Sequence, residues 1–268
     1  MGIQQQAIEA FEAWAPTYDE TVSKELERFA GITQQELLSR LIQLAEVRDG
    51  DLVLDVGTGT GLLATRCAVT LDKGRVIGID VTTGMLRRGV LNAERAGVTQ
   101  RLHYTVGSAA RLPCPDNHFD VVVSSLALHH TEVEHSLDEM MRVLKPAGRV
   151  ALADMGAPPA WRSAPISWLM RLLVSIYKLS GNPTAKADAE AFSRTYTAAE
   201  WRDLLAIRGF EARYVTAILR PGQRIYPCVI LVTAQKPENP PPVSRVSGAD
   251  NRLEGARYRA IVTEYRSR

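Results

Sequence analysis

Cysteines are few in this sequence, and their placement supports no pairing. Cys67, Cys114 and Cys228 lie far apart, form no C-x-x-C pair and are odd in number. A disulfide framework and a thiolate zinc site therefore have no support. We expect no bound metal and a reduced, cytoplasmic setting.

Long apolar runs are also missing. The most apolar stretch, residues 166–179, contains Arg171 and Lys178 and is shorter than the ~20 residues that a membrane-spanning helix needs. The first residues lack the basic region and apolar stretch of a secretion signal. We expect no integral membrane association.

Neither sign of charge is in large excess. The chain carries 32 lysines and arginines against 30 acidic residues, a formal net charge of +2. Residues 237–268 hold six arginines and four acidic residues, so they account for the whole excess. The neutral remainder lacks the broad basic surface of nucleic-acid-binding proteins, and only the basic tail favours RNA as a substrate. We expect a small-molecule partner and no nucleic acid.

The sequence does contain enough apolar residues for a core. Of its 268 residues, 46% are hydrophobic and 23% are charged, as in globular proteins. At ~150 residues per domain, the length predicts about two domains.

Short β-branched runs alternate with helical patterns from residue 51 onward. The expected strands are 51–56, 75–80, 102–106, 119–125 and 149–154, and the expected helices between them are 62–71, 85–96 and 136–144. Such alternation is typical of parallel strands joined by crossover helices. We therefore predict an α/β fold with a doubly wound, mostly parallel sheet.

The remaining segments complete the predicted organisation. Residues 3–47 are expected to be helical, with Thr33 and Glu36 forming a capping box. After an insertion at 155–196, a helix at 197–209 precedes two runs, 210–219 and 225–235, whose Pro-Gly loop permits a hairpin. The sheet then has seven strands with an antiparallel final strand. These patterns divide the chain into an N-terminal helical part at 1–50, a domain at 51–236, and a proline-rich linker with a mobile tail at 237–268.

A glycine-rich loop follows the first expected strand. Gly57, Gly59 and Gly61 alternate with threonines before a helix, so the backbone can approach a ligand and the helix can offer free N–H groups. A tight turn without a ligand is the alternative. A dinucleotide fingerprint would need glycine at Leu62, which disfavours a nicotinamide oxidoreductase.

The stretch VLDVGTGTG, residues 53–61, closely resembles the first motif of class I S-adenosylmethionine-dependent methyltransferases. The resemblance extends over residues 51–154 and implies a Rossmann-like fold with S-adenosylmethionine as cofactor. It also implies that residues 1–50 form a helical lid and that 155–196 form a helical insertion on the acceptor side. The cofactor-binding residues that it implies are Tyr18, Asp55, Gly57, Gly59, Asp80, Val81, Met85, Ser108, Ala109 and Ser124.

The resemblance gives several of these residues specific roles. Asp80 would accept hydrogen bonds from the ribose hydroxyls, and Val81 and Met85 would pack on the adenine. Ser108 stands where the family often has an acid that binds the adenine amino group, which weakens or redirects that contact. Tyr18 would lie over the methionine end of the cofactor; alternatively, it packs the first helices onto the sheet.

Two histidines follow the fourth expected strand, at the edge where α/β sheets bind ligands. His129 and Asp154, which ends the fifth strand, match a base and its partner in some small-molecule O-methyltransferases. A carboxylate beside an imidazole orients the ring and stabilises its protonated form. We therefore expect His129 to act as general base; the alternative is that it packs structurally.

The insertion should select the acceptor. Its aromatic side chains favour an apolar or aromatic acceptor, and its length and placement are similar to those of quinone C-methyltransferases, although the His-His pair is unusual for them. Alternatively, it covers the sheet edge or pairs two subunits as a homodimer. The expected acceptor-binding residues are His130, Trp161, Trp168, Tyr177 and Tyr196.

These observations lead to one favoured function and two alternatives. We expect O-methylation of a small, fairly apolar acceptor with His129 as base. The alternatives are C-methylation of a quinone-like ring and a catalytically silent protein that only binds S-adenosylmethionine.

Overall fold

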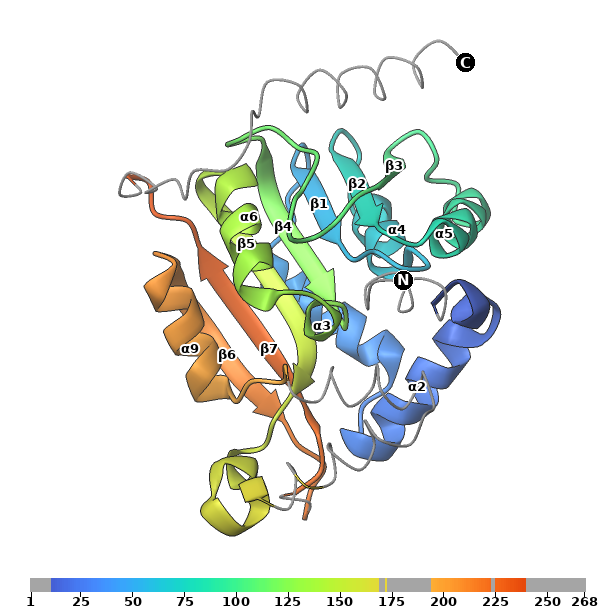
Figure 1. Cartoon of the computed structure of the whole chain (residues 1–268). Coiled ribbons are helices and arrows are strands. Elements are labelled where there is room, and N and C mark those ends of the chain that lie inside the picture. The colour runs from blue at the N-terminus through green and yellow to red at the C-terminus, as the bar shows by residue number, and fades with distance from the viewer. Residues whose placement is uncertain (1–10, 169–171, 173–193, 223–224, 240–268) are drawn as a thin grey trace, which may run out of the picture.

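Seven strands form one mixed sheet in the computed structural model, which describes residues 11–168, 172, 194–222 and 225–239 (Figure 1). The strand order is β3-β2-β1-β4-β5-β7-β6. All neighbours are parallel except β7, which is antiparallel to both β5 and β6. The strands are β1 (Leu52–Val56), β2 (Arg75–Asp80), β3 (Leu102–Val106), β4 (Phe119–Ser125), β5 (Leu144–Gly156), β6 (Glu211–Ile218) and β7 (Cys228–Gln235). The predicted doubly wound sheet with an antiparallel final strand is confirmed.

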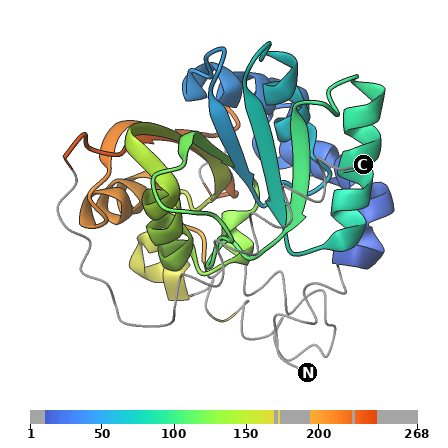
Figure 2. The ribbon, with the colours of Figure 1, turned by 90° about the horizontal axis from the view of Figure 1, so that it is seen from above.

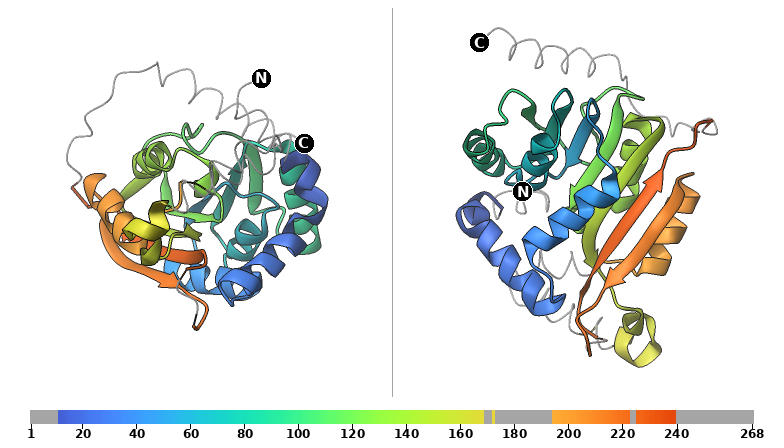
Figure 3. Two further views of the ribbon diagram at one scale, coloured as in Figure 1. Left: turned by 60° about the horizontal axis from the view of Figure 1, so that its bottom comes forward. Right: turned by 180° about the vertical axis from the view of Figure 1, so that it is seen from behind.

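Helices cover both faces of this sheet (Figure 2). Seen from behind in Figure 3, α3 crosses the strands, and it contacts β5 most closely. The α-helices are α2 (Tyr18–Phe29), α3 (Gln34–Ala45), α4 (Leu62–Val69), α5 (Thr83–Arg95), α6 (Val133–Val143) and α9 (Ala198–Ile207). The short 3-10 turns are η1 (Ala15–Thr17), η2 (Leu128–His130) and η3 (Pro159–Arg162).

The side-chain alternation of a strand divides the core into two layers. In β1, Val53 packs with buried residues of α3 and α4, whereas Leu54 and Val56 pack with those of α6 and α9. Because successive side chains of a strand point to opposite faces, the buried apolar side chains on both faces of β1 require helices on both sides.

Local signals in the sequence account for the helix ends. Thr197 and Glu200 form a reciprocal capping box at the start of α9. The Thr33 hydroxyl accepts the Glu36 N–H, but the contacts described for this helix do not include the return bond of a capping box. Gly97 follows α5 with a φ of 68°, in the left-handed region that favours glycine.

The structure differs from the sequence expectation around β5. This strand covers residues 144–156 rather than 149–154, because its C-terminal two thirds pair with β7 from Arg149 to Gly156 and its start pairs with β4 at Phe119. Most of the apolar stretch at 166–179 lies outside the described residues, as do most of the insertion and the tail from residue 240. No helix in the described ranges has the length and apolarity to cross a membrane.

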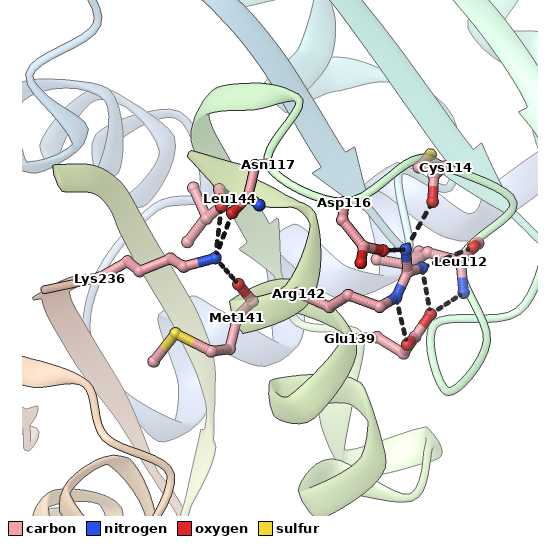
Figure 4. A network of polar contacts seen from close by, with 9 residues as sticks. All are labelled: Leu112, Cys114, Asp116, Asn117, Glu139, Met141, Arg142, Leu144 and Lys236. Atoms are coloured by element: carbon pink, nitrogen blue, oxygen red, sulfur yellow. Dashed lines mark hydrogen bonds and ion pairs between the residues drawn. The ribbon is translucent and has the colours of Figure 1, made fainter. Parts of the chain in front are cut away.

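A polar network ties the connection between β3 and β4 to helix α6 (Figure 4). The guanidinium of Arg142 donates to the Glu139 carboxylate, to Asp116 and to the carbonyl oxygens of Leu112 and Cys114, at 2.7–3.0 Å. Glu139 also accepts the backbone N–H of Leu112. The loop that carries Ser108 and Ala109 is therefore anchored at its far end.

A second cation fastens the end of β7. The Lys236 ammonium donates to the Asn117 side chain and to the carbonyl oxygens of Met141 and Leu144, at 2.7–2.8 Å (Figure 4). Burial lowers the pKa of this amine, and three oxygen acceptors offset the loss of water. The same region holds Ala147 at a φ of 60°, in the left-handed region that favours glycine.

Replacing Arg142 by alanine should destabilise the protein by about 3 kcal/mol, because it leaves Glu139 partly buried without its cation and two carbonyl groups without a donor. Urea unfolding measures this change. Arg40→Ala is the matched control, since its pair with Glu36 is half exposed and contributes only about 0.3–0.5 kcal/mol. Equal losses in the two variants would contradict the anchoring role of Arg142.

Candidate functional site

The glycine loop leaves β1 in a left-handed backbone conformation. Gly57, Gly59 and Gly61 have φ values of 67°, 54° and 73°. A Cβ at Gly57 would collide with the Ala127 side chain, and one at Gly61 would collide with Tyr104, so packing alone requires these two glycines. A Cβ at Gly59 would meet nothing within 4 Å. Packing therefore does not explain Gly59, and the open space beside it fits a ligand that approaches the backbone closely.

Asp80, at the end of β2, faces the same loop. One carboxylate oxygen accepts the Gly59 N–H at 2.9 Å, and the other accepts the Thr82 N–H at 2.8 Å. Burial raises the pKa of Asp80, and these N–H groups counteract the shift. Each oxygen keeps a second lone pair, so the carboxylate can still receive two vicinal hydroxyl groups.

Asp55 lies at the base of the loop and is fully buried. One of its oxygens accepts the Thr58 hydroxyl at 2.7 Å and the Ala64 N–H at 3.1 Å, whereas Oδ1 has no partner among the described residues. Burial raises the pKa of Asp55 to about 7, against the opposing effect of these two hydrogen bonds. An orphaned carboxylate oxygen at this place fits a ligand that brings an N–H donor or a positive charge.

A cavity beside the loop joins the sheet edge to the N-terminal helices. Tyr18 covers it from α2, and burial, followed by the nearby Asp80 carboxylate, raises the pKa of the Tyr18 phenol. The neighbouring Asp19 accepts the Thr60 hydroxyl at 2.6 Å. The other lining residues are Val22, Gln34, Leu38, Asp55, Gly57, Thr58, Gly59, Leu62, Leu63, Ser125 and Leu126.

The residues expected around the adenine follow β2 and β3. Val81 is half-buried, and Met85 is buried on α5 with 2% exposure. The Ser108 hydroxyl accepts the Ala110 N–H at 3.3 Å, so the residue that replaces the usual acid is engaged in a local turn. Ala109 is buried beside it. Their contacts with a cofactor stay predictions.

His129 and Asp154 form the predicted pair. The imidazole Nδ1 lies 2.6 Å from Asp154 Oδ1, and both side chains are buried, with 10% and 3% exposure. β4 and β5 are parallel neighbours, so η2 and the end of β5 bring the two residues to one edge of the sheet. Leu126, with a φ of 54°, turns the chain out of β4 just before this point. Strained backbone of this kind clusters at functional sites.

His130 lies between His129 and the chain at residues 11–19, here called the N-terminal segment. Its ring centroid is 3.9 Å from that of His129 and 4.9 Å from that of Phe11. Burial lowers the pKa of His130 well below its usual value, and the charges of His129 and Arg194 add to the effect. The ring is therefore neutral at ordinary pH.

The other expected acceptor residues do not share one location. The Trp161 indole donates to the Ile225 carbonyl at 2.8 Å and is buried, Trp168 is 69% exposed, and the Tyr196 hydroxyl donates to Glu134 at 2.6 Å. Tyr177 lies outside the described residues. Ser124, expected at the cofactor, is buried and donates to the Val56 carbonyl at 2.7 Å, while its neighbour Ser125 lines the cavity. Successive side chains of a strand point to opposite faces, so Ser125 rather than Ser124 meets the cavity.

Three contacts of the N-terminal segment were not predicted from the sequence. Asp19 binds Thr60, Glu12 binds the start of α5, and Phe11 contacts His130. They join residues far apart in the chain, and no local pattern indicates which acid or ring will meet which partner. The described residues contain no cluster that could hold a metal ion, and their three cysteines are free and buried.

The raised pKa of Asp55 predicts how stability depends on pH. A group whose pKa is higher in the folded state contributes stability at low pH, and that contribution is lost as the pH rises from about 4 to about 7. Asp55→Asn keeps an oxygen for Thr58 and Ala64 but cannot ionise. Urea unfolding should show that the free energy of unfolding of the unmodified protein falls by on the order of 1–3 kcal/mol between pH 5 and pH 8, whereas that of the variant changes little.

Asp49→Asn serves as the control for this experiment. Backbone N–H groups of Lys73 and Asp72 lower the pKa of the exposed Asp49, so its titration lies below the pH range used. The same pH dependence in the unmodified protein and in Asp55→Asn would contradict the assignment.

Part of this site lies in a segment that matches known proteins. A family described as methyltransferase domain matches residues 54–152. The ubiquinone/menaquinone biosynthesis C-methyltransferase UbiE of Vibrio cholerae is 36% identical over 119 residues, which are 44% of this chain and 46% of that protein. The UbiE of Francisella tularensis subsp. novicida is 39% identical over 114 residues, 42% of this chain and 46% of that protein. The matched part thus spans about half the length of these curated relatives.

Solved structures share the fold. A SAM-dependent methyltransferase from Aquifex aeolicus has a TM-score of 0.57 at 20% identity, covering 82% of this chain and 98% of the other. Geranyl diphosphate C-methyltransferase from Streptomyces coelicolor A3(2) has a TM-score of 0.61 at 13% identity, covering 82% and 83%. At these identities the likeness concerns the fold alone. Residues 54–152 thus match a methyltransferase domain family and are similar in sequence to UbiE C-methyltransferases, and the chain shares the fold of solved S-adenosylmethionine-dependent methyltransferases.

Proposed function

We propose that this chain transfers a methyl group from S-adenosylmethionine to the hydroxyl group of a small, fairly apolar ring, with His129 as general base. The observation that carries the proposal is the buried His129–Asp154 pair at the sheet edge that also presents the glycine loop and Asp80. Open α/β sheets bind their ligands at this edge.

The residues present fit the cofactor. The open space at Gly59 suits close approach of a ligand to the backbone, and Asp80 suits the two hydroxyl groups of a ribose. The orphaned Oδ1 of Asp55 and the covering Tyr18 suit the charged methionine end. When bound, S-adenosylmethionine supplies a methyl group on a positively charged sulfur.

His129 has the arrangement of a general base. Nδ1–H donating to Asp154 leaves Nε2 as the nitrogen that accepts a proton, and the carboxylate stabilises the imidazolium that results. Nε2 would take the proton of the acceptor's hydroxyl group while the acceptor oxygen displaces S-adenosylhomocysteine from the methyl carbon, so that the carbon–sulfur bond breaks as the carbon–oxygen bond forms. The proton then leaves the imidazole to water, which returns the base to its starting state.

C-methylation is the second candidate, because the relatives that match this chain are named as quinone C-methyltransferases. The same base serves this outcome. Loss of the hydroxyl proton from a phenol places negative charge on the neighbouring ring carbons as well as on oxygen. Either atom can then attack, and the orientation of the ring decides between them. A ring carbon that takes the methyl group must afterwards lose its hydrogen as a proton to restore the aromatic ring.

The experiment that tests this proposal incubates the full chain with S-adenosylmethionine and a panel of phenols, catechols and hydroquinones that carry apolar substituents. Mass spectrometry detects the products, and NMR distinguishes a methyl ether from a ring methyl. Binding of S-adenosylhomocysteine without any methylated product would instead support the catalytically silent protein. Absence of binding would overturn both.

Gly59→Ala should lower the affinity for S-adenosylhomocysteine at least tenfold in calorimetry, because its methyl group occupies the open space beside the loop. Gly97→Ala is the matched control. Both glycines have a positive φ and no atoms within 4 Å of an added Cβ, so both variants have a similar backbone strain of about 1 kcal/mol. Of these two glycines, Gly59 lines the cavity and Gly97 does not. Equal affinities in the two variants would argue against cofactor binding at this loop.

His129→Ala should reduce the turnover rate by about 10²–10⁴-fold with an un-ionised phenol. With an acceptor whose hydroxyl is already ionised at the assay pH, the turnover rate of the variant should fall much less, because this acceptor needs no base. His135→Ala is the control, since His135 lies 2.6 Å from Glu132 but is exposed. Single-turnover rates measure the effect, and an unchanged rate in His129→Ala would sink the assignment of the base.

A further inference from the structure

The N-terminal segment spans both halves of the site. Glu12 binds the start of α5, directly after Asp80 and Thr82, on the cofactor side. Phe11, its neighbour in sequence, contacts the His130 ring on the acceptor side. Two adjacent residues therefore connect the part of the site that would bind the cofactor to the part that would hold the acceptor.

Glu12 fixes the position of this segment. Its carboxylate accepts the Gly84 N–H at 2.9 and 3.0 Å and the Thr83 hydroxyl at 2.9 Å. The Gly84 N–H is one of the free backbone groups of the first turn of α5, where the helix dipole favours a negative charge. The Gly84 N–H is the main cause of the lowered pKa of Glu12, so the carboxylate stays ionised at neutral pH. A side chain at Gly84 would occupy the place of the Glu12 carboxylate oxygen.

A chain of contacts runs from Phe11 to the base. Phe11 meets His130 edge to face, at 4.9 Å and 79°. His130 lies 3.9 Å from the His129 ring, and His129 holds Asp154 at 2.6 Å. The Trp14 and Tyr18 rings also contact Phe11, at centroid distances of 6.0 and 6.4 Å. Every ring in the chain touches the next, so a displaced Phe11 would free His130 to move.

We propose that Phe11 is a positioning residue: held across the sheet edge by the Glu12 carboxylate, its ring fixes His130 and thereby the His129 imidazole that faces the acceptor. The proposal rests on the proposed function. His130 then serves as a neutral spacer rather than as a second base. The groups that act electrostatically on His130 are His129, from the same turn, and Arg194; Asp154 follows beyond His129.

Histidine NMR titration of the full chain without ligands tests the arrangement independently of activity. In the unmodified protein, the His130 imidazole should stay neutral well below pH 6.5. In Phe11→Ala the ring gains contact with water, so its pKa should rise toward the ordinary value. Phe11→Leu fills part of the space and should give an intermediate result.

Kinetics with the best acceptor of the panel then test whether Phe11 positions the base or only packs against the rest of the protein. Phe11→Ala should lower kcat by about tenfold and shift the pH profile of kcat, while its affinity for S-adenosylhomocysteine changes less than threefold. Phe29→Ala is the control, because Phe29 lies on the same N-terminal helices but contacts Tyr226. It should leave both the His130 titration and the pH profile unchanged.

Gly84→Ala provides a second variant that leaves Phe11 intact. Alanine suits a helix better than glycine, so α5 should keep its stability while the added methyl displaces Glu12. The His130 titration should move in the same direction as in Phe11→Ala. An unmoved His130 titration in both variants, or equal effects in Phe29→Ala, would overturn the proposal. An unmodified chain that methylates nothing would instead overturn the proposed function, and the titrations would still decide the role of Phe11.

Discussion

Parallel pairing of the central strands is the constraint on which the rest of the structure depends. β2, β1, β4 and β5 run in one direction, so their carboxyl ends meet at a single edge. Three buried or nearly buried carboxyl groups, Asp55, Asp80 and Asp154, lie at the ends of three of these strands. Helices on both faces exclude water from the sheet. The polar groups therefore concentrate at this edge, where backbone N–H groups and loops can satisfy them.

Each of these carboxyl groups is stabilised in a different way. Asp80 is held by two N–H groups and stays available to a diol, whereas Asp55 has one oxygen without a partner and a pKa raised to about 7. Asp154 is paired with an imidazole. In the proposed function, the different partners separate three tasks on one edge: holding the ribose, meeting the charged end of the cofactor and orienting a base.

The N-terminal segment adds contacts to this edge that come from outside the sheet. Tyr18, Asp19, Glu12 and Phe11 each contact a different part of it: the cavity, the glycine loop, the start of α5 and His130. Elsewhere, Arg142 anchors the loop after β3 to α6. The N-terminal segment and this loop are thus anchored by charged groups, whereas the sheet is held by apolar packing.

The sequence by itself determined the alternation of strands and helices, the glycine loop and the acids at the strand ends, because these follow from local periodicity, backbone freedom and a motif of fixed spacing. It also predicted the His129–Asp154 pair, since neighbouring parallel strands end side by side. Only the tertiary structure decided that Ser124 and Trp161 turn inward, that Tyr196 binds Glu134, and that Glu12 meets Gly84, 72 residues away. Contacts of this kind depend on how helices pack against the sheet, which no local pattern in the chain encodes.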